Sequence, residues 1–307
     1  MLWGEKRYHS LDYHLKKIYG SKIQKISLDA GMTCPTRDGT KGTRGCIFCS
    51  AQGSGDFTTK PCGSITKQID EAIANMSPNK KSGGRYIAYF QSFTNTYAPV
   101  EYLRKIFFEA ISHEKTAGIS IATRPDCLSQ ETIGLLCELQ QIKPVWVELG
   151  LQTIHEDTAR FIRRGYTLDV FEQAVSELSD KSIEIIVHVI LGLPHETKDK
   201  MLETINYIAH SPVSGIKLQL LHVLTDTDLA DYYGTFHILS EDEYTELVIE
   251  CLEHLPGDMV IHRMTGDGPS NLLIAPLWSL KKRSVLNNIN RKLKEKNTWQ
   301  GRLYDKT

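Results

Sequence analysis

One loop of the chain carries three cysteines, in the sequence Cys34-Pro-Thr-Arg-Asp-Gly-Thr-Lys-Gly-Thr-Arg-Gly-Cys46-Ile-Phe-Cys49. The two-residue gap between Cys46 and Cys49 lets both thiolates point at one centre, and the glycine-rich arc can bring Cys34 back to it. Three thiolates leave one metal position open, as in an iron–sulfur cluster that takes part in chemistry. Cys62 could instead complete a structural zinc site of four thiolates, and the spacing alone leaves both possibilities open.

The cysteine loop follows the first of six apolar runs that predict buried strands. These runs cover residues 23–28, 86–90, 119–122, 145–151, 183–191 and 216–221. Amphipathic stretches lie between them, such as the stripe of Ile65, Ile69 and Ile73 behind Ser64. Strands that alternate with helices predict an α/β fold with a parallel sheet, here a partial (β/α)6 TIM-like barrel. Catalytic groups in such folds follow the C-terminal ends of strands, where the cysteine loop lies.

The pattern changes towards the end of the chain. We expect a core over residues 1–258, with an N-terminal extension over 1–22 and the cysteine loop over 31–57. Residues 259–307 are expected to form a short α/β C-terminal appendage that contains a polar, basic helix.

Composition restricts the possible partners and location. The chain has 307 residues, of which 41% are hydrophobic and 24% charged, and its formal net charge is -1. No overall field therefore favours DNA or a membrane surface, and we expect neither as a partner. Neither a signal peptide nor a membrane span is evident in the sequence, and seven cysteines suit a reducing compartment, so we expect a cytoplasmic protein.

Several motifs together resemble the radical S-adenosylmethionine (SAM) superfamily. They are the cysteine loop, Ile121-Ala-Thr-Arg-Pro-Asp126, Val147-Glu-Leu-Gly-Leu-Gln152 and Arg163-Arg-Gly-Tyr-Thr167. The last three are similar to the radical domain of the Elongator catalytic subunit, which modifies the wobble uridine of tRNA. Asp38-Gly-Thr40 and Gly53-Ser-Gly-Asp-Phe57 resemble the bacterial YhcC/YtqA-type branch of the superfamily.

The resemblance implies the cofactors and the reaction. A [4Fe-4S] cluster would be held by Cys34, Cys46 and Cys49, and S-adenosyl-L-methionine would bind the open iron. Reductive cleavage of the sulfonium would give a 5′-deoxyadenosyl radical, with the electron supplied by a flavodoxin- or ferredoxin-like donor. The rival is a zinc-stabilised RNA-binding barrel without catalysis.

The same resemblance assigns contacts with SAM to side chains near strand ends. Phe48 could pack on the adenine, and Gln152 and Arg164 are expected at the ribose and carboxylate. Glu148 could replace the glutamate that relatives have where this chain has Ala122. The full set of candidates is Phe48, Gln91, Ser92, Glu148, Gln152, Arg164 and His188. Of these, His188 could equally be a hydrogen-bonded core histidine.

The substrate is predicted from the basic tail and from the resemblance to Elongator. Residues 281–296 contain seven basic residues and one acidic residue. Together with Lys16, Lys17, Lys22 and Lys25 they could form a basic rim for a tRNA backbone, or simply a solvated helix. We expect a tRNA base as substrate, with the wobble uridine as the specific candidate, and a small metabolite or a peptide as the alternative. Asp226 and Asp228 follow the sixth predicted strand and could orient the substrate.

Overall fold

A computed structural model describes residues 1–53, 55–56, 58, 63–76 and 84–305. Cys62 lies outside the described residues, as do parts of the motif at 53–57. The possible role of Cys62 as a zinc ligand therefore stays a prediction.

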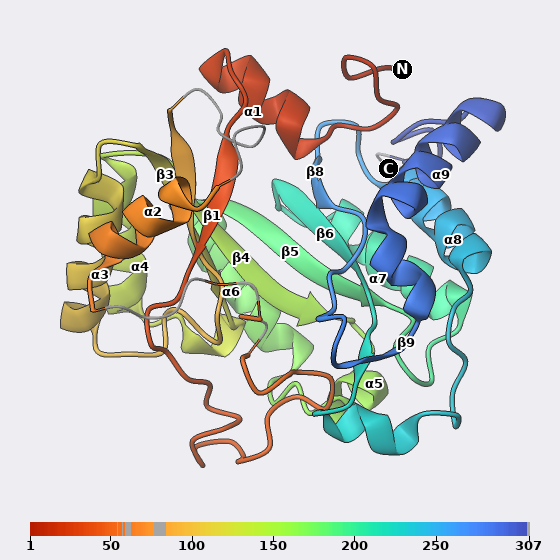
Figure 1. The fold of residues 1–307 in the computed structure, drawn as a ribbon, viewed down its shortest axis with the longest axis horizontal. Coiled ribbons are helices and arrows are strands. Elements are labelled where there is room, and N and C mark those ends of the chain that lie inside the picture. The colour runs from red at the N-terminus through yellow and green to blue at the C-terminus, as the bar shows by residue number, and fades with distance from the viewer. Residues whose placement is uncertain (54, 57, 59–62, 77–83, 306–307) are drawn as a thin grey trace.

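Seven parallel strands form one curved sheet, which confirms the α/β barrel-like fold (Figure 1). In spatial order they are β1 (Gln24–Leu28), β2 (Tyr86–Phe90), β3 (Thr116–Thr123), β4 (Val145–Gln152), β5 (Glu184–Leu191), β6 (Gly215–Leu220) and β8 (Val260–Arg263). The prediction of six strands was one short. Strand β8 pairs in parallel with β6, so the sheet extends past residue 258, where we placed the end of the core. Only Val260 and Ile261 of this strand are buried and apolar, too short a run to predict a strand.

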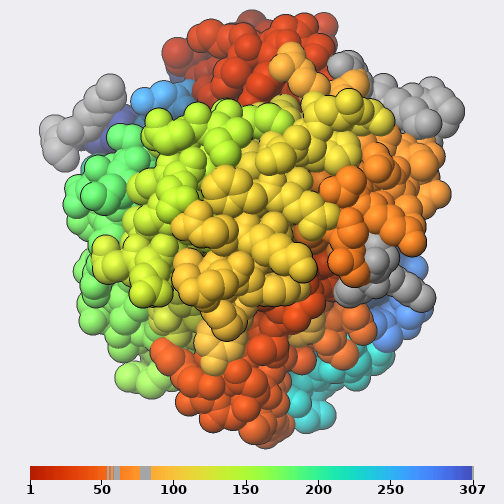
Figure 2. Space-filling model, turned by 90° about the vertical axis from the view of Figure 1, so that its left-hand side faces the viewer, coloured from red at the N-terminus to blue at the C-terminus, as the bar shows by residue number. Residues whose placement is uncertain are grey.

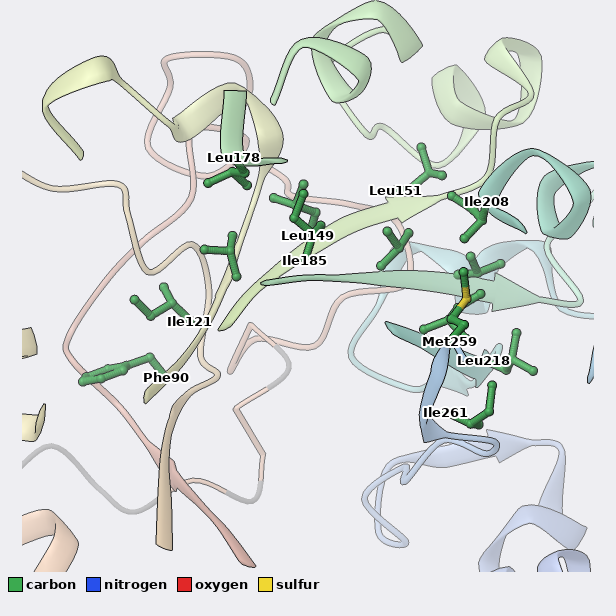
Figure 3. Close-up of a cluster of buried hydrophobic side chains, with 14 of the residues drawn as sticks. Phe90, Ile121, Leu149, Leu151, Leu178, Ile185, Ile208, Leu218, Met259 and Ile261 are labelled. Carbon is green, nitrogen blue, oxygen red and sulfur yellow. The ribbon is translucent and has the colours of Figure 1, made fainter. Parts of the chain in front are cut away.

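Helices pack against the convex face of the sheet through the apolar side chains that the strands point outwards. The helices that follow strands in the sequence are α2 (Ile65–Ala74), α3 (Val100–Ser112), α4 (Gln130–Gln140), α5 (Glu156–Phe161), α6 (Leu168–Asp180), α7 (Lys198–Ala209) and α8 (Glu241–His254). Figure 3 shows part of this core, where Phe90, Ile121, Leu149 and Ile185 project from neighbouring strands. In Figure 2 the yellow residues of α3 and α4 cover the face turned to the viewer.

Helix α1 (Leu11–Tyr19) covers the end of the barrel at which the strands begin. Leu15 of α1 packs with Ile87, Trp146 and Ile186, which belong to β2, β4 and β5. Figure 1 draws α1 at the top and the cysteine loop at the bottom, so the two lie at opposite ends of β1. An apolar plug therefore closes one end of the barrel interior and leaves the other for the site.

The C-terminal part adds a two-stranded antiparallel sheet and one further helix. The strands are β7 (Val223–Leu224) and β9 (Leu273–Ala275), and the helix is α9 (Lys282–Glu295). Val285, Ile289 and Leu293 give α9 a buried apolar stripe, and the helix packs beside α8. In the described part of the chain, none of the helices combines the length and the apolar character needed to cross a bilayer.

Candidate active site

The cysteine loop is fixed to the mouth of the barrel by backbone hydrogen bonds on both sides of Ile47. The Ile47 amide donates to the Ile162 carbonyl at 3.2 Å, and the Ile47 carbonyl accepts from Leu229 at 2.9 Å. The Ile47 side chain is buried in an apolar cluster with Ile190 and Val223. Since Ile47 lies between two residues that face the cavity, this anchor orients both Cys46 and Phe48.

All three loop cysteines line one cavity of about 150 Å³, which we call the thiol cavity. It shares six residues with an outer cavity of about 580 Å³, namely Phe48, Gln91, Gln152, His188, Gln219 and Arg263. Because the two spaces have these walls in common, we treat them as a single chamber. The predicted convergence of the cysteines on one site is thus present in the structure.

The thiols of Cys34 and Cys46 are largely buried, which disfavours their ionised form. Burial raises the pKa of Cys46 to about 12, and the neighbouring Cys49 adds to this increase, whereas Arg124 opposes it. Burial also raises the pKa of Cys34, whose sulfur lies 2.9 Å from the Thr94 hydroxyl. Thiols in this environment ionise when a metal replaces their protons, and nearby cations stabilise the resulting anionic centre.

Two arginines that the sequence analysis did not assign to the cofactor supply these cations. Arg37 donates to the carbonyls of Cys49 and Ser50 at 3.0 and 2.7 Å, so it also fixes the loop. Arg124 is buried beside Asp126, with nitrogen–oxygen distances of 2.8 and 2.9 Å. Both arginines line the thiol cavity. A donor set of three thiols flanked by two guanidinium groups fits an iron–sulfur cluster that is bound by three thiolates.

The zinc alternative finds no support in the described residues. In that part of the chain no three or more His, Cys, Asp or Glu side chains are arranged to hold a single metal ion. The zinc alternative needs Cys62, which lies outside these residues, so it stays an alternative to the cluster.

Phe48, Gln91 and Gln152 line both parts of the chamber, as expected for contacts with a cofactor. Gln152 ends β4 with a φ of 64°, an uncommon backbone conformation for a residue that is not glycine. Such a conformation is maintained only when the surroundings enforce it, and it is concentrated at functional sites. Here it turns the strand end at the chamber wall. The role of each side chain towards SAM stays a prediction.

Arg164 lines the thiol cavity but has its guanidinium bound to other groups, and Ser92 does not line the chamber. Arg164 is only 1% exposed and donates to the carbonyls of Tyr166 and Thr153 at 2.9 and 2.6 Å, and to Glu156 at 2.9 Å. Its guanidinium thus mainly ties β4 to the segment that follows it. Ser92 is buried, lines neither cavity, and has its hydroxyl 3.3 Å from that of Thr58. We therefore withdraw Ser92 as a side-chain ligand.

Glu148 lies at the centre of a buried ionic group in the barrel interior. We call this group the floor cluster, and it consists of Lys25, Tyr89, Ser120, Glu148, His188 and Lys217. One carboxylate oxygen of Glu148 accepts from Lys25 at 2.5 Å and from Ser120 at 2.6 Å. The other accepts from Lys217 and lies 2.7 Å from His188 Nε2. Since four groups already occupy the carboxylate, its predicted contact with the ribose is not favoured.

The predicted basic rim is corrected by the position of Lys25. This lysine points into the barrel rather than to solvent, and alternation along β1 explains why, since Ile26 and Leu28 occupy the outer face. Much of the charge on α9 is also paired with acids: Lys292 with Asp242 and Glu246 at 3.0 Å, Lys282 with Asp267 at 2.5 Å, and Arg291 with Glu295 at 2.6 Å.

The aspartates after the sixth predicted strand contact the cysteine loop and its neighbours. Asp228 pairs with Arg163 and Arg44 at 2.5 and 2.7 Å, and Asp226 accepts from the Ala51 amide at 3.2 Å. Neither residue lines the two cavities. Both therefore support the loop at the mouth of the barrel, and their predicted contact with the substrate is not favoured.

Comparisons with known proteins agree with this geometry. The model of the Radical SAM superfamily matches residues 39–208, and that of the Radical_SAM C-terminal domain matches residues 213–295. The chain is 45% identical to the protein YtqA of Bacillus subtilis over 98% of its own length and 94% of that protein. It is 32% identical to YhcC of Escherichia coli K12, over 92% and 90% of the two chains.

More distant matches extend to Elongator. Human Elongator complex protein 3 is 26% identical over 58% of this chain and 32% of that protein. The solved structure of Methanocaldococcus infernus Elp3 superposes with a TM-score of 0.66 at 15% identity, covering 91% of this chain and 64% of that chain. At this identity the superposition shows a shared fold.

Proposed function

The chain belongs to the radical SAM superfamily, and we propose that it is an enzyme that reductively cleaves S-adenosylmethionine and uses the product on a substrate in the chamber. Members of the superfamily use a [4Fe-4S] cluster and SAM. One observation carries the proposal: three cysteine thiols and the ends of several strands open on the same chamber. When bound, the cluster and SAM supply a 5′-deoxyadenosyl radical that removes a hydrogen atom from a substrate or adds to an unsaturated carbon.

The residues of this chain would contribute binding and exclusion of water. Cys34, Cys46 and Cys49 would hold the cluster, with Arg37 and Arg124 offsetting its negative charge. Phe48 and Gln152, which line both parts of the chamber, would contact the nucleoside part of SAM. The apolar plug around Leu15 closes the opposite end of the barrel, so a reactive species in the chamber would be shielded from solvent on that side.

Anaerobic reconstitution with iron and sulfide tests the reaction. We expect a brown protein that releases 5′-deoxyadenosine when dithionite is added in the presence of SAM. Stoichiometric zinc with no release of 5′-deoxyadenosine would overturn the proposal and favour the non-catalytic barrel. For the electron donor we propose a flavodoxin- or ferredoxin-like protein that docks near the exposed loop residues 39–44; replacement of dithionite by such a donor and its reductase tests this.

For the substrate we propose a tRNA base, with the wobble uridine as the specific candidate. The support is the similarity to Elongator complex protein 3 over 58% of the chain and an outer cavity of about 580 Å³, within the range of pockets that enclose a small ligand. Mass spectrometry of nucleosides from bulk tRNA, with and without the gene, is the test. The loss of one modified uridine would support the proposal, and an unchanged profile would contradict it.

A small-molecule substrate is the second candidate, and the pairing of the tail cations favours it. Lys292, Lys282 and Arg291 are already bound to acids, and Lys25 faces the barrel interior, so the surface has fewer free cations for a phosphate backbone than the sequence indicates. Release of 5′-deoxyadenosine in the presence of fractions from a metabolite extract separates the two candidates.

A further inference from the structure

The floor cluster places two lysines against one carboxylate in the barrel interior. Lys25 comes from β1 and Lys217 from β6, yet both reach Glu148 on β4. Strands β1 and β6 are separated by four others in the sheet, so only the inner face of a strongly curved sheet allows these contacts. The side chains of Glu148 and Lys217 are 0% and 6% exposed, respectively.

With Lys217 protonated, the cluster carries more positive than negative charge; burial lowers the pKa of Lys217 to about 7, so this excess is present in full below pH 7. Burial lowers the pKa of His188 to about 4, so this histidine is neutral near pH 7 and adds no charge. His262, the other buried histidine close to the cluster, also has its pKa lowered by burial. One carboxylate therefore faces two amines, and a buried cation without a counter-charge is costly.

Arg263 extends this excess towards the chamber. In the parallel pairing of β6 and β8, Arg263 lies directly opposite Lys217, and both residues line the thiol cavity. The carboxylate of Asp267 is 3.8 Å from Arg263, but it is held closely by Lys282 at 2.5 Å. Lys217 and Arg263 are thus neighbouring cations on adjacent strands that both face the chamber. Each has to share its carboxylate with another lysine: Glu148 also binds Lys25, and Asp267 also binds Lys282.

The remaining charged groups of the chamber wall are bound elsewhere. Arg37 donates to loop carbonyls, Arg124 is paired with Asp126, and Arg164 with Glu156. Asp56 accepts from the Ser50 hydroxyl at 2.9 Å and lines only the outer cavity. Among the described lining residues, Lys217 and Arg263 are consequently the pair best able to bind an added anion.

We propose that the chamber binds an anionic group of the substrate, a carboxylate or a phosphate, between Lys217 and Arg263 at its floor. The proposal rests on the function proposed above and deepens it by naming the chemical class of the substrate. The carboxylate of SAM is expected at the open iron near the cysteines, so the floor site is assigned to the second reactant. An anion there restores the balance of charge around Glu148 and positions the rest of the substrate in the outer cavity.

Two anions serve as probes for the reconstituted protein, with SAM bound and the cluster not reduced so that no turnover occurs. Propionate and inorganic phosphate are titrated at constant ionic strength against chloride, and binding is followed by anaerobic calorimetry and by the unfolding temperature. We expect one of them to bind the wild type, and the one that binds identifies the group. Affinity should fall at least tenfold in Lys217→Met and in Arg263→Gln, and should be largely retained in Lys217→Arg.

Lys294→Met is the matched control, because Lys294 is an exposed lysine of α9. Arg263→Gln leaves all hydrogen bonds of Glu148 in place. If Lys217→Met fails to fold, the affinity of Arg263→Gln for the probe anion therefore tests the proposal. If neither anion binds the wild type better than chloride, or if Lys294→Met weakens binding as much as Arg263→Gln, the proposal is refuted.

A second measurement addresses the natural substrate. Small metabolites, the class of ligand that a cavity of this volume encloses, are separated on an anion exchanger, and each fraction is assayed for enhanced release of 5′-deoxyadenosine. If the retained fraction enhances the release and Arg263→Gln abolishes this enhancement, the proposal is supported. If the enhancement comes from the unretained fraction, or from tRNA and persists in Arg263→Gln, the proposal is refuted. If the wild type releases no 5′-deoxyadenosine, the proposed function fails, but the anion titration still decides the binding site.

Discussion

Replacement of Glu148 by Gln tests the ionic balance of the floor cluster directly. The substitution keeps the shape of the side chain and removes its charge, which leaves Lys25 and Lys217 without a buried counter-charge. Removal of one partner of a buried ion pair costs about 3–5 kcal/mol. The lysines can limit the cost by losing a proton. Lys217 loses its proton most readily, because burial already lowers its pKa to about 7 in the wild type.

Thermal unfolding of the reconstituted protein is the assay. At about 2 °C per kcal/mol for a chain of this size, we expect the unfolding temperature of Glu148→Gln at pH 7 to fall by about 6–10 °C. Glu114→Gln, which changes an exposed glutamate, should alter it little. The double variant Glu148→Gln/Lys25→Met should recover part of the loss, because it removes one of the two stranded cations.

The pH dependence of this deficit has a definite sign. In Glu148→Gln the pKa of Lys217, which burial already lowers to about 7 in the wild type, falls further because Glu148 no longer raises it, so the unfolded chain binds more protons than the folded chain from below pH 7 up to about pH 10.5. Stability of the variant therefore rises with pH in this window. The wild-type Lys217 keeps its proton below pH 7 and loses it above, so by pH 9 it is neutral in both proteins and the deficit should be smaller than at pH 7. A deficit that is equal to that of Glu114→Gln at pH 7, or that does not shrink by pH 9, would refute the assignment of Glu148 as counter-ion.

Three further outcomes are expected. Cys46→Ala should lose the brown iron–sulfur absorbance and all release of 5′-deoxyadenosine, whereas Cys137→Ala, in a partly buried position on α4, should retain both. Burial lowers the pKa of Lys217 to about 7, and a bound anion raises this pKa again. The affinity for the probe anion should therefore be constant below pH 7 and fall by up to about tenfold per pH unit above it. Constant affinity up to pH 9 would exclude Lys217 as the binding cation. Leu15→Ala should lower the free energy of unfolding by about 2–5 kcal/mol through a cavity in the apolar plug, measured against Ile18→Ala on the exposed side of the same helix.

Most of the fold could be predicted because its signals are local. Each of the six predicted strands is present, since runs such as Val145–Leu151 place an unbroken apolar row on the face that packs against the helices. Strand β8 was missed because its burial depends on pairing with β6 and not on its own composition. The N-terminal helix α1 was likewise not predicted as an element, because its Leu15 becomes a core residue only when the barrel end is present.

The sequence predicted those site residues that lie close together in the chain, and it predicted less well those that come together only through the fold. The cysteines lie in one loop, so their spacing sufficed. Arg37 and Arg124 were not assigned as neighbours of the cluster, since an arginine beside a proline or an aspartate is common on surfaces. For Lys25 a signal existed: Lys25 and Ser27 alternate with Ile26 and Leu28, which indicates a strand with one polar face. In a curved sheet that polar face points into the barrel.

The interior of the barrel is layered, and the order of the layers links its stability to the proposed chemistry. The plug side chains Ile87, Trp146 and Ile186 are each followed two residues later by a member of the floor cluster, namely Tyr89, Glu148 and His188. Because the plug covers the barrel end at α1, the floor cluster is largely shielded on that side, with the Lys25 side chain 17% exposed, and its charges are balanced mainly by each other or by a group that enters through the chamber. In this low-dielectric setting an incoming anion interacts far more strongly than it would at the surface. The same side chains that make Glu148 costly to replace would therefore select an anionic substrate.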